Sequence, residues 1–221
     1  YSPADLPPLE LPLPWLGRLM VRHSPFARIL AHRVGKEEVT FYSLINQPNG
    51  KGISRMIDQL FLHIGAPPLN SRREQVVQTI REALGAVLES GSSRLTFWDI
   101  GSGAGFDSLD IARQLDALKR SGCPVPDYRL VNVDVDGVWL DHNRELAVAL
   151  VDPSTTDRFR RRHLSIFDYL DSDLPDQDIA RDGDLVVSCN GFADFFELTE
   201  LRRLLKGIAR RLESVSGSVL M

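Results

Sequence analysis

Asp99-Ile100-Gly101-Ser102-Gly103-Ala104-Gly105 is the stretch that decides the fold of this chain. It follows an apolar run at residues 95–98 and precedes a segment, 106–115, with the periodicity of a helix. Glycine at every second position lets a ligand approach the backbone where a β-carbon would collide. The free N–H groups at the start of the helix suit a ribose or a carboxylate. The stretch therefore predicts a small-molecule site between a strand and a helix.

The spacing of the glycines separates two kinds of nucleotide-binding turn. A dinucleotide turn has the pattern G-x-G-x-x-G, whose third glycine packs a helix on a strand, but Phe106 stands at that position. The pattern present is D-x-G-x-G-x-G, which resembles motif I of the class I S-adenosylmethionine (SAM)-dependent methyltransferases. A tight turn that binds no ligand is the alternative.

Strands and helices alternate from residue 95 onward, which predicts a parallel sheet with right-handed crossovers. We expect an α/β fold with a doubly wound, mostly parallel Rossmann-like sheet and an N-terminal helical cap. The expected domains are 1–92, a cap or lid with a proline-rich arm at 1–14, and 93–221, a SAM-binding Rossmann-like domain in which no C-terminal hairpin is seen. The expected strands are 95–100, 128–134, 160–166, 184–188 and 217–221, and the expected helices are 106–118, 138–150 and 198–212.

The first ninety residues are expected to be helical. Apolar residues recur at helical spacing between Ile53 and Ile64. Gly65-Ala66-Pro67-Pro68 is expected to end that helix. Ser71 and Glu74 then form a capping box that begins another.

Ligands of open parallel sheets bind beyond the carboxyl ends of the strands, so the residues at these ends are the candidates. Asp134 ends the second strand and can accept bonds from both hydroxyls of a ribose. Asp136 competes for this role, but it is expected to lie past the strand end, and Val135 stands between the two. After the third strand, Phe167 can pack on an adenine face and Asp168 can accept from its amine, although Asp168 as a helix N-cap is an equal alternative.

The fourth strand ends near Ser188 and Asn190, which face the expected position of a sulfonium. Asn190 can bind an amine or a carboxylate without adding charge. Phe192, Phe195 and Phe196 follow, and aromatic rings can exclude water and contact a cation. Core packing is the alternative for each ring.

The region from residue 95 to 221 resembles the class I SAM-dependent methyltransferase superfamily through four motifs in order. These are D-x-G-x-G-x-G at Asp99–Gly105, V-D-V-D at Val133–Asp136, F-D at Phe167–Asp168, and the strand end at Asp184–Asn190. The resemblance implies that Asp99 lies near the methionine amino group and that Gly101, Ser102 and Gly103 lie beside the cofactor. It further implies Asp134 on the ribose and Asp168 on the adenine.

The segment 49–62 also looks like the lead-in of a family of bacterial proteins assigned as methyltransferases, which are sometimes attached to hydrolase-like domains. This second likeness brings no substrate. The superfamily usually ends in a hairpin of strands six and seven that helps to shape the acceptor site. This chain shows no such hairpin, so either the C-terminus is absent or the fold is pared down, and the sequence does not identify the acceptor.

The composition narrows the class of partner. The formal net charge is −4 and two cysteines are present, Cys123 and Cys189, so neither a global basic field for nucleic acid nor a disulfide framework or metal pattern is indicated. No apolar run approaches the roughly 20 residues of a membrane span. We expect a cytoplasmic protein with a small-molecule substrate and no nucleic acid, membrane or metal.

The leading hypothesis is methyl transfer from SAM to a small-molecule acceptor, with S-adenosylhomocysteine as the product. No general base is evident; Asn190 and Tyr42 are the catalytic candidates, and Tyr42 can reach from the lid unless its role is structural. The second hypothesis is attack on the γ-carbon of SAM, as in methyltransferase-like proteins of natural-product biosynthesis. It yields methylthioadenosine, either by cyclisation to azetidine-2-carboxylate or by aminocarboxypropyl transfer. A non-catalytic interaction module with this fold is the third.

Overall fold

The computed structural model describes residues 14–33, 42, 47–49, 51–190, 196–215 and 217–220. The chain forms two compact units, Tyr1–Gln75 and Val76–Met221. The expected boundary at 92/93 therefore differs from the observed division, which falls inside a helix. The proline-rich arm, apart from Pro14, and the rings of Phe192 and Phe195 lie outside the described residues. Among the described residues, no helix combines the length and apolarity needed to cross a membrane.

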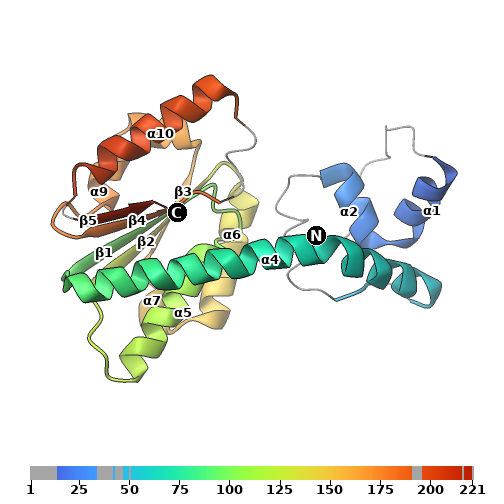
Figure 1. The fold of residues 1–221 in the computed structure, drawn as a ribbon, viewed down its shortest axis with the longest axis horizontal. Helices are drawn as coiled ribbons and strands as arrows, with labels where there is room; N and C mark the ends of the chain where they lie inside the picture. Colours follow the sequence, from blue (N-terminus) through green and yellow to red (C-terminus); the bar gives the residue numbers. More distant parts are fainter. Residues whose placement is uncertain are drawn as a thin grey trace. The chain divides into compact units, whose positions relative to one another are not determined.

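The second unit is a parallel sheet between helices, as the sequence predicts (Figure 1). Its described strands run in the order β3-β2-β1-β4-β5, and all four neighbouring pairs are parallel. The strands are β1 (Arg94–Ile100), β2 (Asp127–Asp134), β3 (Phe159–His163), β4 (Asp184–Ser188) and β5 (Gly217–Leu220). The third strand is shorter than expected, because Ile166 already begins a helix.

Each face of the sheet carries its own apolar core, because side chains alternate between the faces along a strand. One core holds Leu95 and Phe97 of β1 with Ile80 and Leu84 of a long helix. The other holds Trp98 and Ile100 of β1, which alternate with Leu95 and Phe97 along the strand. The helices of this unit are the end of α4 (Ile53–Ser90), α5 (Phe106–Arg120), α6 (Gly137–Leu150), α7 (Pro153–Thr156), α8 (Ile166–Asp171), α9 (Leu174–Asp178) and α10 (Leu198–Leu212).

The first unit is helical, with α1 (Trp15–His23), α2 (Pro25–Arg33) and the beginning of α4. Ser24 begins α2, because its hydroxyl oxygen accepts the N–H of Ala27 at 2.9 Å. The small core consists of Phe26, Ile29 and Leu62, with Tyr42 and Phe61 packed against it.

The prediction that Gly65-Ala66-Pro67-Pro68 ends a helix is wrong, since α4 runs unbroken from Ile53 to Ser90. Ser71 and Glu74 therefore lie inside a helix and form no capping box there. A proline inside a helix costs about 3 kcal/mol. Packing at both ends opposes this cost: Leu62 lies in the core of the first unit, and Ile80 lies in the core of the second. Tertiary contacts outweigh local propensity in this helix.

Candidate functional site

The candidate site lies between β1 and β4, where the order in which the chain adds strands to the sheet reverses. From β1 the chain proceeds outward to β2 and β3, and then returns to the other side of β1 for β4 and β5. Ligands of open α/β sheets bind beyond the strands at this point. The glycine stretch follows β1 and Asn190 follows β4, so the two segments that the sequence singled out flank the reversal.

The glycine turn is shaped by bonds to β2. The N–H groups of Gly101 and Ser102 donate to the carbonyl of Val133, at 2.9 and 3.3 Å. Gly101, Gly103 and Gly105 have φ values of 62°, 51° and 67°, in the left-handed region where a β-carbon is disfavoured.

Gly105 has a second reason to lack a side chain. It precedes the first residue of α5, and a β-carbon there would collide with the side-chain nitrogens of Asn132 and Asn143. The amide of Asn143 donates to the carbonyl of Ala104 at 3.0 Å, and that of Asn132 donates to Ser108 Oγ at 2.8 Å. Two buried amides thus clamp the turn from β2 and α6.

Asp134 ends β2 beside this turn. One carboxylate oxygen accepts the N–H of Gly103 at 2.7 Å, and the other accepts that of Asp136 at 2.8 Å. A carboxylate has about four acceptor positions, so both oxygens keep capacity for the hydroxyls of a ligand. Asp136 lies past the strand, as expected, and caps α6 by accepting from Val138 N at 3.0 Å.

A row of polar side chains crosses the sheet below the turn. Asp99 is in register with Asn132 on one side and with Ser188 on the other, and Arg161 is next to Asn132. Residues paired in register on parallel strands point to the same face. Asp99 is 4% exposed, and its carboxylate faces the amide of Ser108 in the first turn of α5, at 3.4 Å. A negative charge is favoured at such a helix start.

Arg161 enters this row from β3, where it donates to Asn143 Oδ1 at 2.8 Å. Burial lowers its pKa to about 10, so the guanidinium stays charged at neutral pH. The charge therefore supports Asn143, which in turn holds the glycine turn.

Asp107 is a residue of the site that the sequence analysis missed. Its carboxylate accepts from Ser188 Oγ at 2.6 Å and from Asn190 Nδ2 at 2.8 Å, which ties the start of α5 to the end of β4. Asn190 Nδ2 also donates to Ser188 Oγ at 2.8 Å. Both amide hydrogens of Asn190 are used in this way, and its carbonyl oxygen has no partner among the described residues. The sequence signal for Asp107 was an acid in the first turn of a helix. Asn132 and Asn143 were also missed, and their signal was a polar residue within an apolar segment.

Ser102 gives a test of whether the turn fits a polar ligand. Its side chain is 9% exposed, and its buried oxygen has no hydrogen-bond partner among the described residues. Buried polar atoms are nearly always paired. This unpaired hydroxyl lies within the glycine turn, and the next residue, Gly103, donates to Asp134. The arrangement fits a ligand with hydroxyl or amino groups.

Phe167 and Asp168 lie in α8, which packs on the face of the sheet opposite α5. The ring of Phe167 meets that of Phe196 at 5.3 Å and lies under the guanidinium of Arg203 at 4.8 Å. Asp168 is not an N-cap: Ser165 caps α8 by accepting the N–H of Asp168 at 3.1 Å, and its hydroxyl donates to the Asp168 carboxylate at 2.7 Å. Val135 is 67% exposed next to Asp134, and its carbonyl accepts from His163 Nε2 at 2.9 Å.

Tyr42 lies in the first unit, where its described contacts are internal. Its hydroxyl donates to Asp58 at 2.6 Å, and its ring stacks on Phe26 at 5.6 Å. Burial and Asp58 raise the pKa of Tyr42, so the phenol stays neutral. These contacts fit the structural alternative for Tyr42.

Cys189 lies between Ser188 and Asn190 and is half-buried. Burial and the nearby charge of Asp99 raise the pKa of this thiol to about 11. It is therefore a neutral thiol at physiological pH. Among the described residues, no group of three or more His, Cys, Asp or Glu side chains is arranged to hold a metal ion.

Comparisons with known proteins bear on the fold. No family model and no curated protein matches the chain. A solved structure, of a possible exported protein from Bordetella parapertussis, is similar with a TM-score of 0.57 and 17% sequence identity. The similarity covers 93% of this chain and 60% of that protein, so this chain spans less than two thirds of its length. At this identity the likeness supports the fold alone.

Proposed function

We propose that the unit Val76–Met221 binds SAM at the glycine turn and that the protein is a SAM-dependent methyltransferase with a small-molecule acceptor. The observation that carries the proposal is the turn itself. Gly101, Gly103 and Gly105 bring bare backbone to the end of β1, and Asp134 and the unpaired hydroxyl of Ser102 lie beside it. This donor and acceptor set suits a nucleoside with a free ribose.

The residues of the chain would divide the ligand among them. Asp134 would accept from the ribose hydroxyls, and the amide groups of the turn would lie against the amino acid portion. The carbonyl oxygen of Asn190, fixed through Asp107, would accept from an amino group or from the acceptor. The bound cofactor supplies a methyl group already activated by the sulfonium. The protein's task is then alignment and exclusion of water.

The proposal includes the cytoplasmic location and the role of the helical unit as a lid, both expected from the sequence. The exposed Cys123 and the neutral Cys189 are free thiols, as is usual in a reducing compartment.

Isothermal titration with SAM and with S-adenosylhomocysteine tests the site. Asp134→Ala should weaken binding by about 1.5–3 kcal/mol, or roughly 10- to 150-fold, because a charged hydrogen-bond partner is lost. Asp136→Ala is the matched control, since it removes a neighbouring carboxylate that caps α6, and it should bind normally. Absence of heat with the unmodified protein, or equal losses in the two variants, would refute the site.

Mass spectrometry after incubation with SAM separates the reaction types. S-adenosylhomocysteine formed in the presence of an acceptor supports methyl transfer. Methylthioadenosine formed from SAM alone would replace this proposal with chemistry at the γ-carbon. Binding without turnover for every acceptor offered would favour an interaction module.

A further inference from the structure

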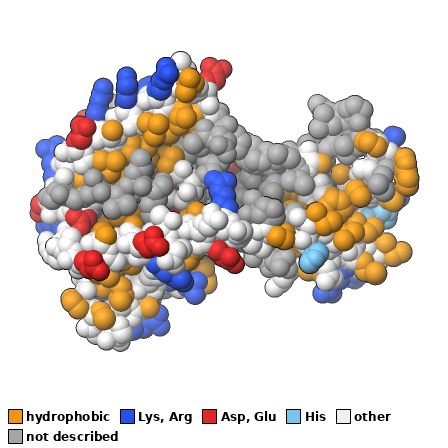
Figure 2. All heavy atoms as spheres, viewed as in Figure 1, with side chains coloured by type: hydrophobic (Ala, Val, Ile, Leu, Met, Phe, Trp, Pro, Cys, Tyr) orange, Lys and Arg blue, Asp and Glu red, His pale blue; other side chains and the backbone are white. Residues whose placement is uncertain are grey.

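The helix α10 carries a row of cations that the candidate site does not use. Arg202, Lys206 and Arg210 recur every four residues and are exposed; we call them the basic row. Successive members lie about 6 Å apart along the helix axis. Figure 2 shows Lys and Arg side chains along α10 beside an apolar strip.

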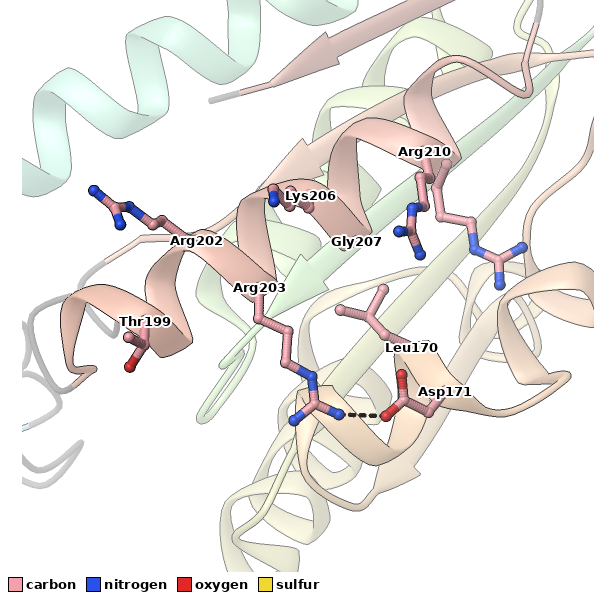
Figure 3. A pocket seen from close by; sticks show the side chains of 9 residues that line it. Leu170, Asp171, Thr199, Arg202, Arg203, Lys206, Gly207 and Arg210 are labelled. Carbon is pink, nitrogen blue, oxygen red and sulfur yellow. Dashed lines mark hydrogen bonds and ion pairs between the residues drawn. The ribbon is translucent and has the colours of Figure 1, made fainter.

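The basic row has no ion-pair partner among the described residues, in contrast to the cations next to it. Arg203 pairs with Asp171 of α8 (Figure 3), and Arg211 pairs with Asp176 of α9 at 2.8 Å. The acids that face α10 from these helices are therefore already engaged. Like charges one turn apart slightly destabilise a helix, although Arg210 lies in the last turn, where a cation is favoured.

The row borders a cavity of about 550 Å³ between α10 and α8. Leu170 and Gly207 meet in this cavity, where a β-carbon on Gly207 would lie 2.7 Å from Leu170 Cδ1. In Figure 3 the basic side chains are spread along the helix and do not converge on one point. Such a distribution suits an elongated anion better than a single phosphate or carboxylate.

Four observations decide among elongated anions. None of the described residues that line the cavity is aromatic, and the formal net charge is −4, which disfavours single-stranded nucleic acid. The apolar face of α10 is already buried in the core through Leu204 and Ile208, so it is not free to enter a membrane. Leu198 and Leu205 are 63% and 46% exposed beside the row, and they offer apolar contact to a protein surface.

We propose that the basic row docks an acidic α-helix of a partner protein. The partner's helix would present carboxylates one turn apart, which match the 6 Å repeat of the row, and apolar residues that cover Leu198 and Leu205. This surface lies on the face of the sheet away from α5, whereas the glycine turn leads into α5.

The test uses a fluorescein-labelled helical peptide with three Glu at one-turn spacing and flanking Leu residues, read by fluorescence anisotropy. The R202E/K206E/R210E variant should bind it at least about tenfold more weakly than the unmodified protein, and binding should weaken as salt rises. The matched control is R81E/R113E/K119E, which makes the same change in charge on α4 and α5, and it should bind within about twofold of the unmodified protein. The neutral variant R202Q/K206Q/R210Q should fall between, and circular dichroism checks that each variant is folded.

The same variants are titrated with a peptide in which Gln replaces Glu, with single-stranded RNA and with anionic vesicles. Loss of binding by the Gln peptide supports the proposal. No binding of the Glu peptide, equal losses in the two charge-reversal variants, or row-dependent binding of RNA or vesicles in place of the peptide would overturn it.

Discussion

At Gly105, a single added β-carbon would disturb both the fold and the candidate site. Gly105→Ala should destabilise the protein in two ways: about 1–2 kcal/mol for a left-handed backbone at a residue with a β-carbon, and about 1–3 kcal/mol for crowding against Asn132 and Asn143. Chemical unfolding measures the sum.

Gly122→Ala is the matched control for this prediction. Gly122 has a φ of 80°, and a β-carbon there meets nothing within 4 Å, so only the backbone cost should appear. Equal losses of unfolding free energy in the two variants would show that the amides of Asn132 and Asn143 do not hold the turn as described.

Cys189 should resist alkylation, because burial and the charge of Asp99 raise its pKa to about 11. At pH 8.5 only about 0.3% of such a thiol is ionised. Iodoacetamide followed by peptide mass spectrometry should label the exposed Cys123 first. The raised pKa also contributes stability that is complete below the ordinary thiol value of about 9 and is lost as the pH rises through 11. Rapid labelling of Cys189 in the folded protein would contradict this description.

The glycine turn was predictable from sequence because its geometry is local: glycines, an acid and the start of a helix lie within a few residues. The position of Asp134 beside the turn was predictable because parallel strands end at one edge of the sheet. The role of Asp107 was not, since its partners Ser188 and Asn190 lie more than 80 positions away and meet it only when β4 pairs with β1.

At the scale of the element, the beginning of α4 depends on one buried carboxylate. Asp58 is fully buried and accepts four hydrogen bonds, from Ser24 Oγ, Phe26 N, Tyr42 OH and Asn49 N. It thereby joins α4 to the start of α2 and to the segment that precedes α4.

Asp58→Ala should unfold the helical unit selectively. Each buried donor left without a partner costs about 1–3 kcal/mol, and four donors exceed what so small a core can offset. Hydrogen exchange should show lost protection in residues 15–33 and 53–64, with the sheet unit unchanged. Gln59→Ala, an exposed change on the same helix, should leave exchange unaltered. Normal protection in the Asp58 variant would show that the carboxylate does not join these segments.

The helices were less predictable than the strands where packing competes with local signals. Pro67 and Pro68 are strong stop signals by propensity, yet α4 continues through them because distant contacts hold both of its ends. The boundary between units could not be predicted at 75/76 for the same reason: Ile80 and Leu84 look like any amphipathic stripe until the sheet that they cover is known.

At the scale of the whole molecule, the proposed function predicts that SAM stabilises the sheet unit. At a ligand concentration 100 times the Kd, the unfolding free energy should rise by about 2.7 kcal/mol. Trp98 and Trp139, both buried in this unit, report its unfolding by fluorescence. The Asp134→Ala variant should show a smaller rise at the same SAM concentration. An unchanged unfolding midpoint for the unmodified protein at saturating SAM would contradict the proposal.

The bonds from Val133 and Asp134 to the glycine turn also have a kinetic consequence. These bonds already fix the conformation of the turn in the free protein, so a ligand has to order little of the backbone when it binds. Stopped-flow mixing should then show a rapid encounter whose rate grows linearly with concentration. A slower second phase would report a rearrangement elsewhere, such as movement of the helical unit.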